Sequence, residues 1–414
     1  MKVILITNSN HGAGAPKAAK RLHESLLLNN CDSKIWVNNK HGDDERVIEP
    51  SGKFLKTINI LKLYLSIIFV KLLKTNNEIL HSPQIFSSPY WLKAINESDA
   101  DIVHLHWFQK EMISISDLSK IKKPIVWTLH DMWGFCGAEH YSYDNRWNEG
   151  YLKSNRPIGE GGLDLNMWTW KRKKKYWKKP IQIIAPSHWM KESVNKSLLM
   201  KEWPVSVIPN PINIDVWNPV DKKIARDLIN LPKDLDLILF GAASGTKSYI
   251  KGFDLLHDAI IKMGKSNNKK QIGLVIFGQS KPKNPPKYNF PVFYLGYLND
   301  ILSLKTAYSA ADLLVIPSRL DNLPNMGVEA NACGTPIVAF NNAGLPSIIK
   351  NKHNGYLAKP FDVNDLLKGI YWVLDSDREQ LKKNCINHVL DNFESKKIAL
   401  EHVELYKKII KRLD

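Results

Sequence analysis

Cysteine is scarce in this chain of 414 residues. The four cysteines lie far apart and form no CxxC pair; they are Cys31, Cys136, Cys333 and Cys385. This spacing argues against a disulfide framework and against a structural zinc site. We therefore expect a reducing environment, such as the cytoplasm.

Long apolar runs are missing as well. A helix needs about 20 apolar residues to cross a bilayer, and lysines interrupt the longest candidate, residues 58–74. The apolar run near the N-terminus is too short for the core of a signal peptide and is typical of a first strand. The sequence thus predicts a soluble protein.

Negative charge is in short supply. Lys and Arg number 58 against 41 Asp and Glu, which gives a formal charge of +17. This surplus favours an anionic partner: nucleic acid, a lipid headgroup layer or a phosphorylated small molecule. The hydrophobic content of 44% is that of an ordinary globular protein, and the length suits two or three domains.

Short apolar runs alternate with helix-like stretches throughout the chain, which is typical of a parallel α/β fold. Runs this apolar suit strands that are covered on both faces. In the first half, the predicted strands are residues 2–7, 33–37, 101–107, 124–131 and 181–187. In the second half, they are residues 236–243, 272–278, 292–298, 312–318 and 336–340.

A linker separates the two series of strands. Residues 207–219 contain three prolines and three asparagines, which disfavour a regular element. We expect one Rossmann-like domain over residues 1–206, a second over 220–390, and a closing helix within 391–414. Ligands of open α/β sheets bind at the carboxyl ends of the strands, so we expect one active site in a cleft between the domains.

A glycine-containing loop, Gly12-Ala13-Gly14, follows the first predicted strand. The glycines would let a ligand approach the backbone, and Pro16 suits the first turn of a helix, whose N-terminus attracts phosphate. An ordinary glycine turn explains the segment equally well. The loop is not GxGxxG and no acidic residue ends the second strand, so a nicotinamide cofactor is disfavoured.

Histidines follow two of the predicted strands. His130 and Asp131 end residues 124–131, where His130 could make a polar contact or transfer a proton. A structural histidine is the equally good alternative. His104 and His106 share one face of their strand, but no third ligand accompanies them, so we favour packing over a metal site.

Two acidic residues of the second half, Asp321 and Glu329, flank a loop and the start of a helix. We expect Asp321 to accept hydrogen bonds from a polyol and Glu329 to hold a ribose diol, because carboxylates offer paired acceptor oxygens. The amides between them would bind a diphosphate; they belong to Leu323, Pro324, Asn325 and Met326.

Several segments follow one another in a definite order along the chain: MKVILITNSNHGAGA, TLHDMW, APSHW, VIPNPI, IKGFDLL, PSRLDNLPNMGVEANACGTPIVAFNNAGLPSII and NGYLAKP. Together they resemble retaining glycosyltransferase family four, and most closely its bacterial members that build capsule, exopolysaccharide or O-antigen. The resemblance covers almost the whole chain. It implies a GT-B fold of two Rossmann-like domains, a nucleotide-sugar donor held mainly by the C-terminal domain, and no required metal ion or other cofactor.

The resemblance also implies roles for single residues. Asp321 and Glu329 fill the two acidic positions of the family motif, and Lys251 fills the lysine that faces the donor diphosphate. The remaining positions are the sugar-side histidine His130, the phosphate-facing loop Gly12, Ala13 and Gly14, and the base-reading backbone around Tyr297 and Leu298.

The chain departs from the family pattern at two places. Asp321 stands where glutamate is usual, and because its side chain is shorter, the family pattern does not identify the donor sugar. The cation often found after the strand that precedes the KG pair is missing from GAASGT, and Lys247 is our candidate for supplying that charge.

Two basic segments have other interpretations. Residues 168–179 interleave seven basic residues with aromatics, which could bind single-stranded nucleic acid; we favour a solvated helix face. At 100° per residue, the lysines around residues 58–74 gather within about 60°, except for Lys62; they are Lys53, Lys56, Lys71 and Lys74. Such a helix can lie on an anionic membrane, or it can pack on the sheet.

The leading hypothesis is a cytoplasmic, membrane-associated glycosyltransferase. It would move a sugar from a UDP- or GDP-linked donor to a glycan or lipid-linked glycan in cell-surface polysaccharide synthesis. A sugar-nucleotide epimerase on the same fold is the alternative enzyme. A nucleic-acid-binding protein is disfavoured, because it leaves Asp321, Glu329 and the glycine loop without a role.

Overall fold

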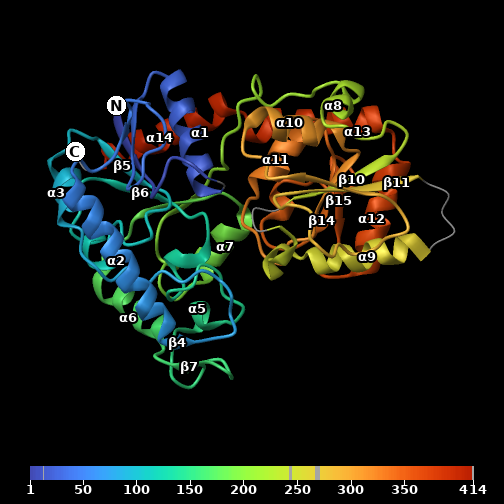
Figure 1. The fold of residues 1–414 in the computed structure, drawn as a ribbon. Helices are drawn as coiled ribbons and strands as arrows, with labels where there is room; N and C mark the ends of the chain where they lie inside the picture. Colours follow the sequence, from blue (N-terminus) through green and yellow to red (C-terminus); the bar gives the residue numbers. More distant parts are fainter. Residues whose placement is uncertain (13, 242–244, 266–270, 413–414) are drawn as a thin grey trace. The chain divides into compact units, whose positions relative to one another are not determined.

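The computed structural model describes residues 1–12, 14–241, 245–265 and 271–412. The chain divides into two compact units, which Figure 1 shows in the colours of the sequence. Unit 1 comprises Met1–Pro211 and Lys396–Asp414, and unit 2 comprises Ile212–Ser395.

Unit 1 is built on a parallel sheet with the strand order β3-β2-β1-β5-β6-β8-β9. The short edge strands β3 and β9 are absent from the sequence prediction, because two or three residues carry no recognisable apolar run. The strand order reverses between β1 and β5, where the loops at the carboxyl edge diverge. The strands are β1 (Lys2–Ile6), β2 (Asp32–Trp36), β3 (Val47–Ile48), β5 (Ile102–Leu105), β6 (Ile125–Thr128), β8 (Gln182–Ala185) and β9 (Val205–Val207).

The helices of unit 1 lie between and after these strands. They are α1 (Ala15–Leu28), α2 (Lys53–Lys71), α3 (Pro89–Glu97), α4 (Ile115–Leu118), η1 (Met132–Gly134), α5 (Arg146–Glu149), α6 (Leu165–Tyr176), α7 (His188–Lys196) and α14 (Ser395–Ile410). A small antiparallel pair joins β4 (Leu73–Lys74) to β7 (Gly161–Gly162). Among the described residues, no helix combines the length and hydropathy needed to cross a bilayer.

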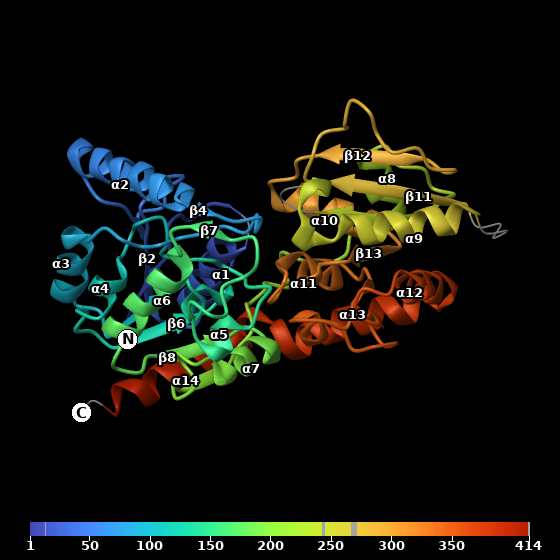
Figure 2. The ribbon, with the colours of Figure 1, turned by 90° about the horizontal axis from the view of Figure 1, so that it is seen from below.

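The last helix of the chain belongs to the first unit. Ile398, Ala399 and Tyr406 of α14 share an apolar core with Val3 and Leu22, and Figures 1 and 2 show α14 beside the elements of unit 1. The expected closing helix at 391–414 is thus α14, but residues 391–393 still belong to the preceding helix, α13 (Arg378–Phe393).

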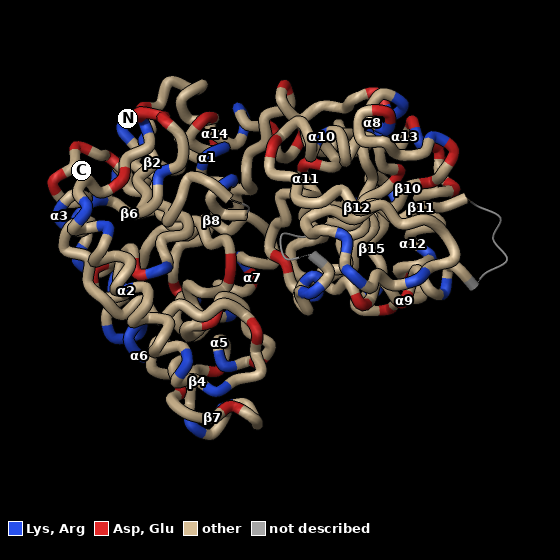
Figure 3. The backbone as a smooth tube through the Cα atoms, in the orientation of Figure 1, with Lys and Arg blue, Asp and Glu red and all other residues tan. Residues whose placement is uncertain are grey.

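The basic helix α6 is not the uniformly solvated face that the sequence analysis favours. Its basic residues lie at the edge of unit 1 in Figure 3, yet the side chain of Lys173 is completely buried. Its Nζ donates to the carbonyl oxygens of Trp133, Cys136 and Gly137, and burial lowers its pKa to about 7. Lys173 therefore anchors α6, because three carbonyl oxygens take the place of its hydration shell.

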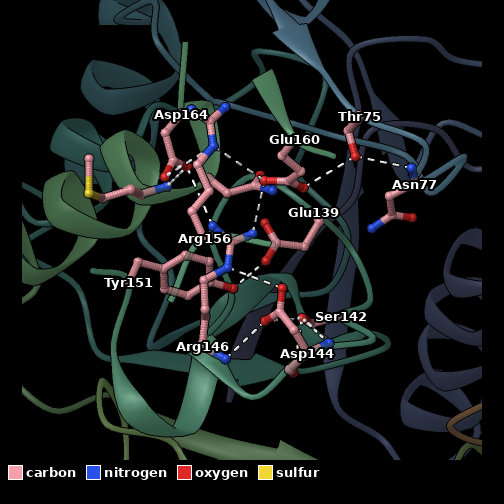
Figure 4. A network of polar contacts seen from close by, with 12 residues as sticks. Thr75, Asn77, Glu139, Ser142, Asp144, Arg146, Tyr151, Arg156, Glu160 and Asp164 are labelled. Carbon is pink, nitrogen blue, oxygen red and sulfur yellow. Dashed lines mark hydrogen bonds and ion pairs between the residues drawn. The ribbon is translucent and has the colours of Figure 1, made fainter. Parts of the chain in front are cut away.

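A buried arginine holds together the long segment between β6 and β8 (Figure 4). Arg146 forms ion pairs with Asp144 at 3.1 Å, Glu160 at 3.3 Å and Asp164 at 3.6 Å, and its guanidinium lies 4.8 Å from the ring centre of Tyr151. These contacts offset the cost of burying the charge. They give the segment a fixed structure although it contains little regular secondary structure.

Unit 2 is built on a second parallel sheet, with the order β12-β11-β10-β13-β14-β15. Its strands are β10 (Asp236–Gly241), β11 (Ile272–Phe277), β12 (Val292–Gly296), β13 (Leu313–Ile316), β14 (Ile337–Phe340) and β15 (Gly355–Ala358). The sequence prediction omits β15 and extends β10 to residues 242 and 243, which lie outside the described residues. Here the order reverses between β10 and β13.

Helices cover both faces of this sheet. One apolar core includes residues of α10 and α11, the other residues of α9 and α12, and Figure 1 shows the two pairs on opposite sides. The helices and turns of unit 2 are α8 (Lys222–Leu228), η2 (Gly245–Lys247), η3 (Tyr249–Lys251), α9 (Phe253–Lys265), α10 (Ile301–Ala310), α11 (Asn325–Ala332), η4 (Leu345–Ser347), α12 (Val363–Asp375) and α13.

The segment expected to be a linker is largely integrated into the units. Val207 ends β9, while Ile212 and Trp217 are buried in the core of unit 2. The amide of Ile212 also donates to the carbonyl of Phe393 at 2.9 Å. The prolines prevent regular structure here, as expected, but the apolar side chains between them still pack.

Candidate functional site

The reversal of strand order in unit 2 brings together two segments that are far apart in the sequence. η3 follows β10, and the Ser318–Asp321 segment follows β13, at the carboxyl edge of the sheet. There Lys251 Nζ lies 2.6 Å from Asp321 Oδ2, and Ser318 Oγ lies 3.4 Å from the same oxygen. Asp321 is buried, whereas about a third of the Lys251 side chain is exposed. A lysine ammonium is thus fixed at the position where ligands of such sheets bind.

The position of Lys251 depends on the glycine that follows it. Gly252 has a φ of 66°, and a Cβ at this residue would lie 2.0 Å from the carbonyl oxygen of Pro317. Both the left-handed backbone and the close approach require glycine. Lys251 and Gly252, the KG pair, therefore depend on each other. Gly252 allows the turn that carries Lys251 to lie directly against the loop that carries Asp321.

Arg319 fastens the same two segments together, and the sequence analysis does not identify it. Its guanidinium donates to both carboxylate oxygens of Asp254, at 2.7 and 2.5 Å, and to the carbonyl of Tyr249. The guanidinium also lies 4.0 Å from the Tyr249 ring centre, and its amide donates to Ile250 O at 2.7 Å. The pKa of Asp254 is lowered by the hydrogen bond from Arg319. Such a bidentate pair fixes orientation as well as distance.

Glu329 lies on α11, within the core of unit 2. It is 1% exposed, and its Oε2 accepts a hydrogen bond from the Tyr308 hydroxyl at 3.0 Å. Tyr308 belongs to α10, so no sequence pattern connects the two residues. The bond fixes the rotamer of Glu329 and leaves it little freedom to adapt to a ligand.

The expected amide cluster at the start of α11 needs one correction. Pro324 is the N-cap of α11, and proline has no N–H, so it cannot donate to a phosphate. Leu323, Asn325 and Met326 do have amides at this helix start. The role of Pro324 is to preset the backbone where the loop enters the helix.

The other expected donor-side residues of unit 2 lie on the loops after β10 and β12. Lys247 is exposed on η2, and Tyr297 is exposed while Leu298 is half-buried just after β12. Thr246 donates to Gln279 Oε1 through its amide at 2.9 Å and its hydroxyl at 3.0 Å. Gln279 was not identified from the sequence, and it ties the loop after β11 to η2.

In unit 1, the glycine loop lies at the carboxyl edge of β1, beside the reversal of strand order. Gly12 and Gly14 have φ values of 118° and 69°, and Gly14 is the N-cap of α1, with Pro16 in its first turn. Ala13 lies outside the described residues. Both glycines adopt backbone conformations that other residues rarely take.

His106 directly follows β5, His130 lies two residues after the neighbouring strand β6, and the two side chains bond to each other. His130 Nε2 lies 2.9 Å from His106 Nδ1, and their rings stack with centres 5.2 Å apart. Burial lowers the pKa of His130 to about 4 and the pKa of His106 well below its usual value. Both rings are therefore neutral near pH 7, and His130 suits a hydrogen-bonding role better than the transfer of a proton.

His104 and Asp131 have structural partners. His104 bonds to the Tyr406 hydroxyl at 2.6 Å and to Thr128 Oγ1 at 2.7 Å, which links the sheet to α14. Asp131 Oδ2 lies 2.6 Å from His140 Nδ1. Burial opposes the ionisation of Asp131, but the charge and hydrogen bond of His140 lower the pKa of Asp131.

Among the described residues, no group of three or more His, Cys, Asp or Glu side chains is arranged to hold a metal ion.

Two family models match this chain. The model "Glycosyl transferases group 1" matches residues 236–376, and the model "Glycosyltransferase Family 4" matches residues 46–216. The first match includes Lys251, Asp321 and Glu329, and the second includes His106 and His130. Lys251, Asp321 and His130 thus lie within the regions that these models match, whereas the glycine loop at residues 12–14 lies outside both.

Curated relatives match about half of the chain. An uncharacterized glycosyltransferase of Methanocaldococcus jannaschii is 32% identical over 240 residues, which cover 55% of this chain and 60% of that protein. An Escherichia coli UDP-Gal:α-D-GlcNAc-diphosphoundecaprenol α-1,3-galactosyltransferase is 24% identical over 52% of this chain and 57% of its own length.

Solved structures match over the whole chain. The Anabaena protein HepE in complex with UDP-glucose is similar with a TM-score of 0.66 and 14% identity, covering 99% of this chain and 100% of that chain. At this identity the similarity concerns the fold alone. Two parallel α/β units of this type form the GT-B fold, which confirms the fold expected from the sequence.

Proposed function

We propose that this chain, a glycosyltransferase of the family-four type by its two matching domains, transfers a sugar from a nucleotide sugar with retention of the anomeric configuration and without a metal ion. The donor is UDP- or GDP-linked. The acceptor is a glycan or lipid-linked glycan of a cell-surface polysaccharide, and the reaction takes place in the cytoplasm. The observation that carries this proposal is the Lys251–Asp321 pair beside the start of α11.

The geometry of unit 2 suits a nucleoside diphosphate. The Lys251 ammonium and the amides of Asn325 and Met326 would oppose the negative charge of the diphosphate, while Asp321 keeps the lysine in place. Glu329 would accept hydrogen bonds from the ribose hydroxyls. The E. coli relative is named for a UDP-linked donor and a diphosphoundecaprenol acceptor, which supports the same pairing of substrates here.

In the proposed reaction, the bond between the anomeric carbon and the diphosphate oxygen breaks, and the acceptor hydroxyl oxygen bonds to that carbon from the same face. The proton of the hydroxyl passes to the leaving diphosphate. The positive charge and the helix amides stabilise the diphosphate as its charge grows, which is usually the largest contribution to catalysis of this kind. His130, neutral and half-buried, would donate or accept one hydrogen bond to a substrate hydroxyl.

A thermal-shift screen of UDP-, GDP-, ADP- and dTDP-sugars tests the donor. A ligand that binds only the folded protein raises the free energy of unfolding, by about 2.7 kcal/mol at 100 times its Kd. We expect at least one UDP- or GDP-sugar to raise the Tm by several degrees, and acceptor addition to release free nucleotide. No shift with any of the four classes would contradict the proposal, and an isomerised sugar still joined to its nucleotide would indicate an epimerase.

Glu329→Gln tests the ribose contact. The amide keeps the volume and one acceptor oxygen but removes the charge, so we expect the KM for the donor to rise about 10-fold or more, with a smaller effect on kcat. Glu379→Gln, at an exposed residue of α13, is the control. A change in kcat alone would instead place Glu329 at the reacting bond.

A further inference from the structure

We infer that the outward face of α2 docks on an anionic lipid surface and so holds unit 1 at a membrane. The inference goes beyond the proposed transfer reaction and stands on the side chains of one helix. We define the α2 face as the exposed large apolar residues of this helix and its C-cap: Phe54, Ile60, Leu61, Tyr64, Leu65, Ile67, Ile68 and Leu72.

The α2 face is unusual for a helix of a globular domain. Such helices turn their apolar stripe toward the core, but in α2 Ser66 is the single buried residue. The side chains of Phe54 and Tyr64 are 76% and 64% exposed, and that of Ile68 is 56% exposed. Contiguous exposed apolar surface of this kind marks an interaction site. Figures 1 and 2 both show α2 at the periphery of unit 1.

The opposite side of α2 is fixed to unit 1. Lys62 Nζ donates to the carbonyl of Ser87 at 2.6 Å, and Ser66 Oγ donates to Glu111 Oε1 at 2.8 Å. The hydrophilic contacts thus lie toward the protein, and the apolar residues lie outside. At 100° per residue, the α2 face covers an arc of about 160° that excludes both Lys62 and Ser66.

The charges around the α2 face select a lipid surface as its occupant. Lys53 and Lys71 lie at the two ends of the helix on the same side as the α2 face, and α2 itself contains no Asp or Glu. Lys56, at the margin of the face, is paired with Glu49 at 2.7 Å, so Lys53 and Lys71 carry the argument. Lysines at both ends would repel a second copy of the same face, whereas they attract anionic headgroups. Their long side chains can reach the headgroups while the apolar residues between them enter the interface.

The helix has the features of an in-plane rather than a spanning element. It does not combine the length and apolar character needed to cross a bilayer, and lysines lie at both its ends. A helix lying in the interface buries one face to a depth of about 5–10 Å, which the 160° arc of the α2 face matches. Tyr64, near the middle of the helix, has an aromatic body suited to this region.

Cosedimentation with vesicles tests the inference on the full-length protein without nucleotide or acceptor, so the result does not depend on the proposed transfer reaction. We expect binding to phosphatidylcholine vesicles containing 30% phosphatidylglycerol, and at least tenfold weaker binding to pure phosphatidylcholine or in 0.5 M salt. Failure of the wild-type protein to bind the anionic vesicles would overturn the inference.

Two sets of variants locate the binding surface. The triple variant Leu61→Ser, Tyr64→Ser, Ile68→Ser should lower the partition coefficient at least tenfold, whereas Ile224→Ser, Leu228→Ser, at exposed apolar residues of α8, should change it less than twofold. The double variant Lys53→Glu, Lys71→Glu keeps the α2 face and should also weaken binding tenfold. Its control is Lys368→Glu, Lys383→Glu, at exposed lysines of α12 and α13.

Two other possibilities, a different membrane-binding element and a second copy of the α2 face, would give results that differ from those expected for lipid binding by α2. Undiminished vesicle binding by both α2 variants would overturn the inference and point to the basic helix α6. Sedimentation velocity without lipid distinguishes a second copy: a wild-type dimer that the triple variant converts to a monomer would also overturn it. Unchanged thermal shifts of the variants with nucleotide sugar would show that the donor site of unit 2 is intact in either case.

Discussion

Lys251→Ala is expected to lower kcat/KM for sugar transfer by about 10³-fold while leaving the protein folded. The ammonium is held 2.6 Å from Asp321 at the carboxyl edge of the sheet, where the donor diphosphate is proposed to bind. Removing one preorganised group that stabilises a developing negative charge typically costs 10²–10³-fold, and the loss of a full positive charge lies at the upper end of this range. Steady-state kinetics with the donor identified by thermal shift provide the measurement.

The chain contains a matched control for this substitution. Lys222 also forms an ion pair with a buried aspartate, Asp312, at 2.8 Å, but at the amino end of the sheet. Lys222→Ala should therefore leave kcat/KM within about twofold, because Arg226 and Arg378 still pair with Asp312. Equal losses in both variants would mean that stability rather than chemistry explains the effect, and full activity of Lys251→Ala would refute the assignment of the donor site.

Asp312→Ala is expected to destabilise unit 2 by about 3–5 kcal/mol, the usual cost of removing one partner from a buried ion pair. The Asp312 side chain is almost fully buried and forms an ion pair with Arg226, which is equally buried. Asp312 Oδ2 also accepts a hydrogen bond from the Leu237 amide at 2.6 Å. Without it, the Arg226 charge stays in the core without its carboxylate partner. Figure 3 shows charged residues of both signs gathered near α8 and α13.

Chemical denaturation of the full chain measures this loss. Asp227→Ala is the control, because Asp227 pairs with Lys233 on the surface of the same unit and exposed pairs contribute little. A loss for Asp312→Ala no greater than that for the control would contradict the structural role of this cluster.

Asp312 also makes the stability of unit 2 depend on pH. Burial opposes its ionisation, but Lys222, the Leu237 amide and Arg226 lower its pKa below the usual value. The stabilisation is therefore complete above the unfolded pKa, near 4, and is lost as the pH falls through the lower folded pKa. Between pH 7 and pH 3 the wild-type protein should lose more stability than Asp312→Asn, which has no carboxylate to protonate.

The fold was predictable because its signals are local. A buried parallel strand must be apolar on both faces, so β1, β5, β10 and β13 are visible as short Val-, Ile- and Leu-rich runs. Edge strands such as β3 and β9 lack this signal because few of their residues are buried. The segment 207–219 shows the same limitation: its prolines correctly indicate irregular structure, but only the packing shows that Ile212 and Trp217 belong to the core of unit 2.

The sequence by itself determined which residue types are available to the candidate site: Lys251, Asp321 and Glu329 in unit 2, and the glycine loop and His130 in unit 1. The tertiary structure alone decided their partners, since Asp321 meets Lys251, Tyr308 meets Glu329 and His106 meets His130 across intervals that no periodic pattern spans. It also decided burial, placing Lys173 inside and the apolar residues of α2 outside. The physical reason is that composition and periodicity report what one element requires, whereas contacts and solvent exposure depend on which other elements pack against it.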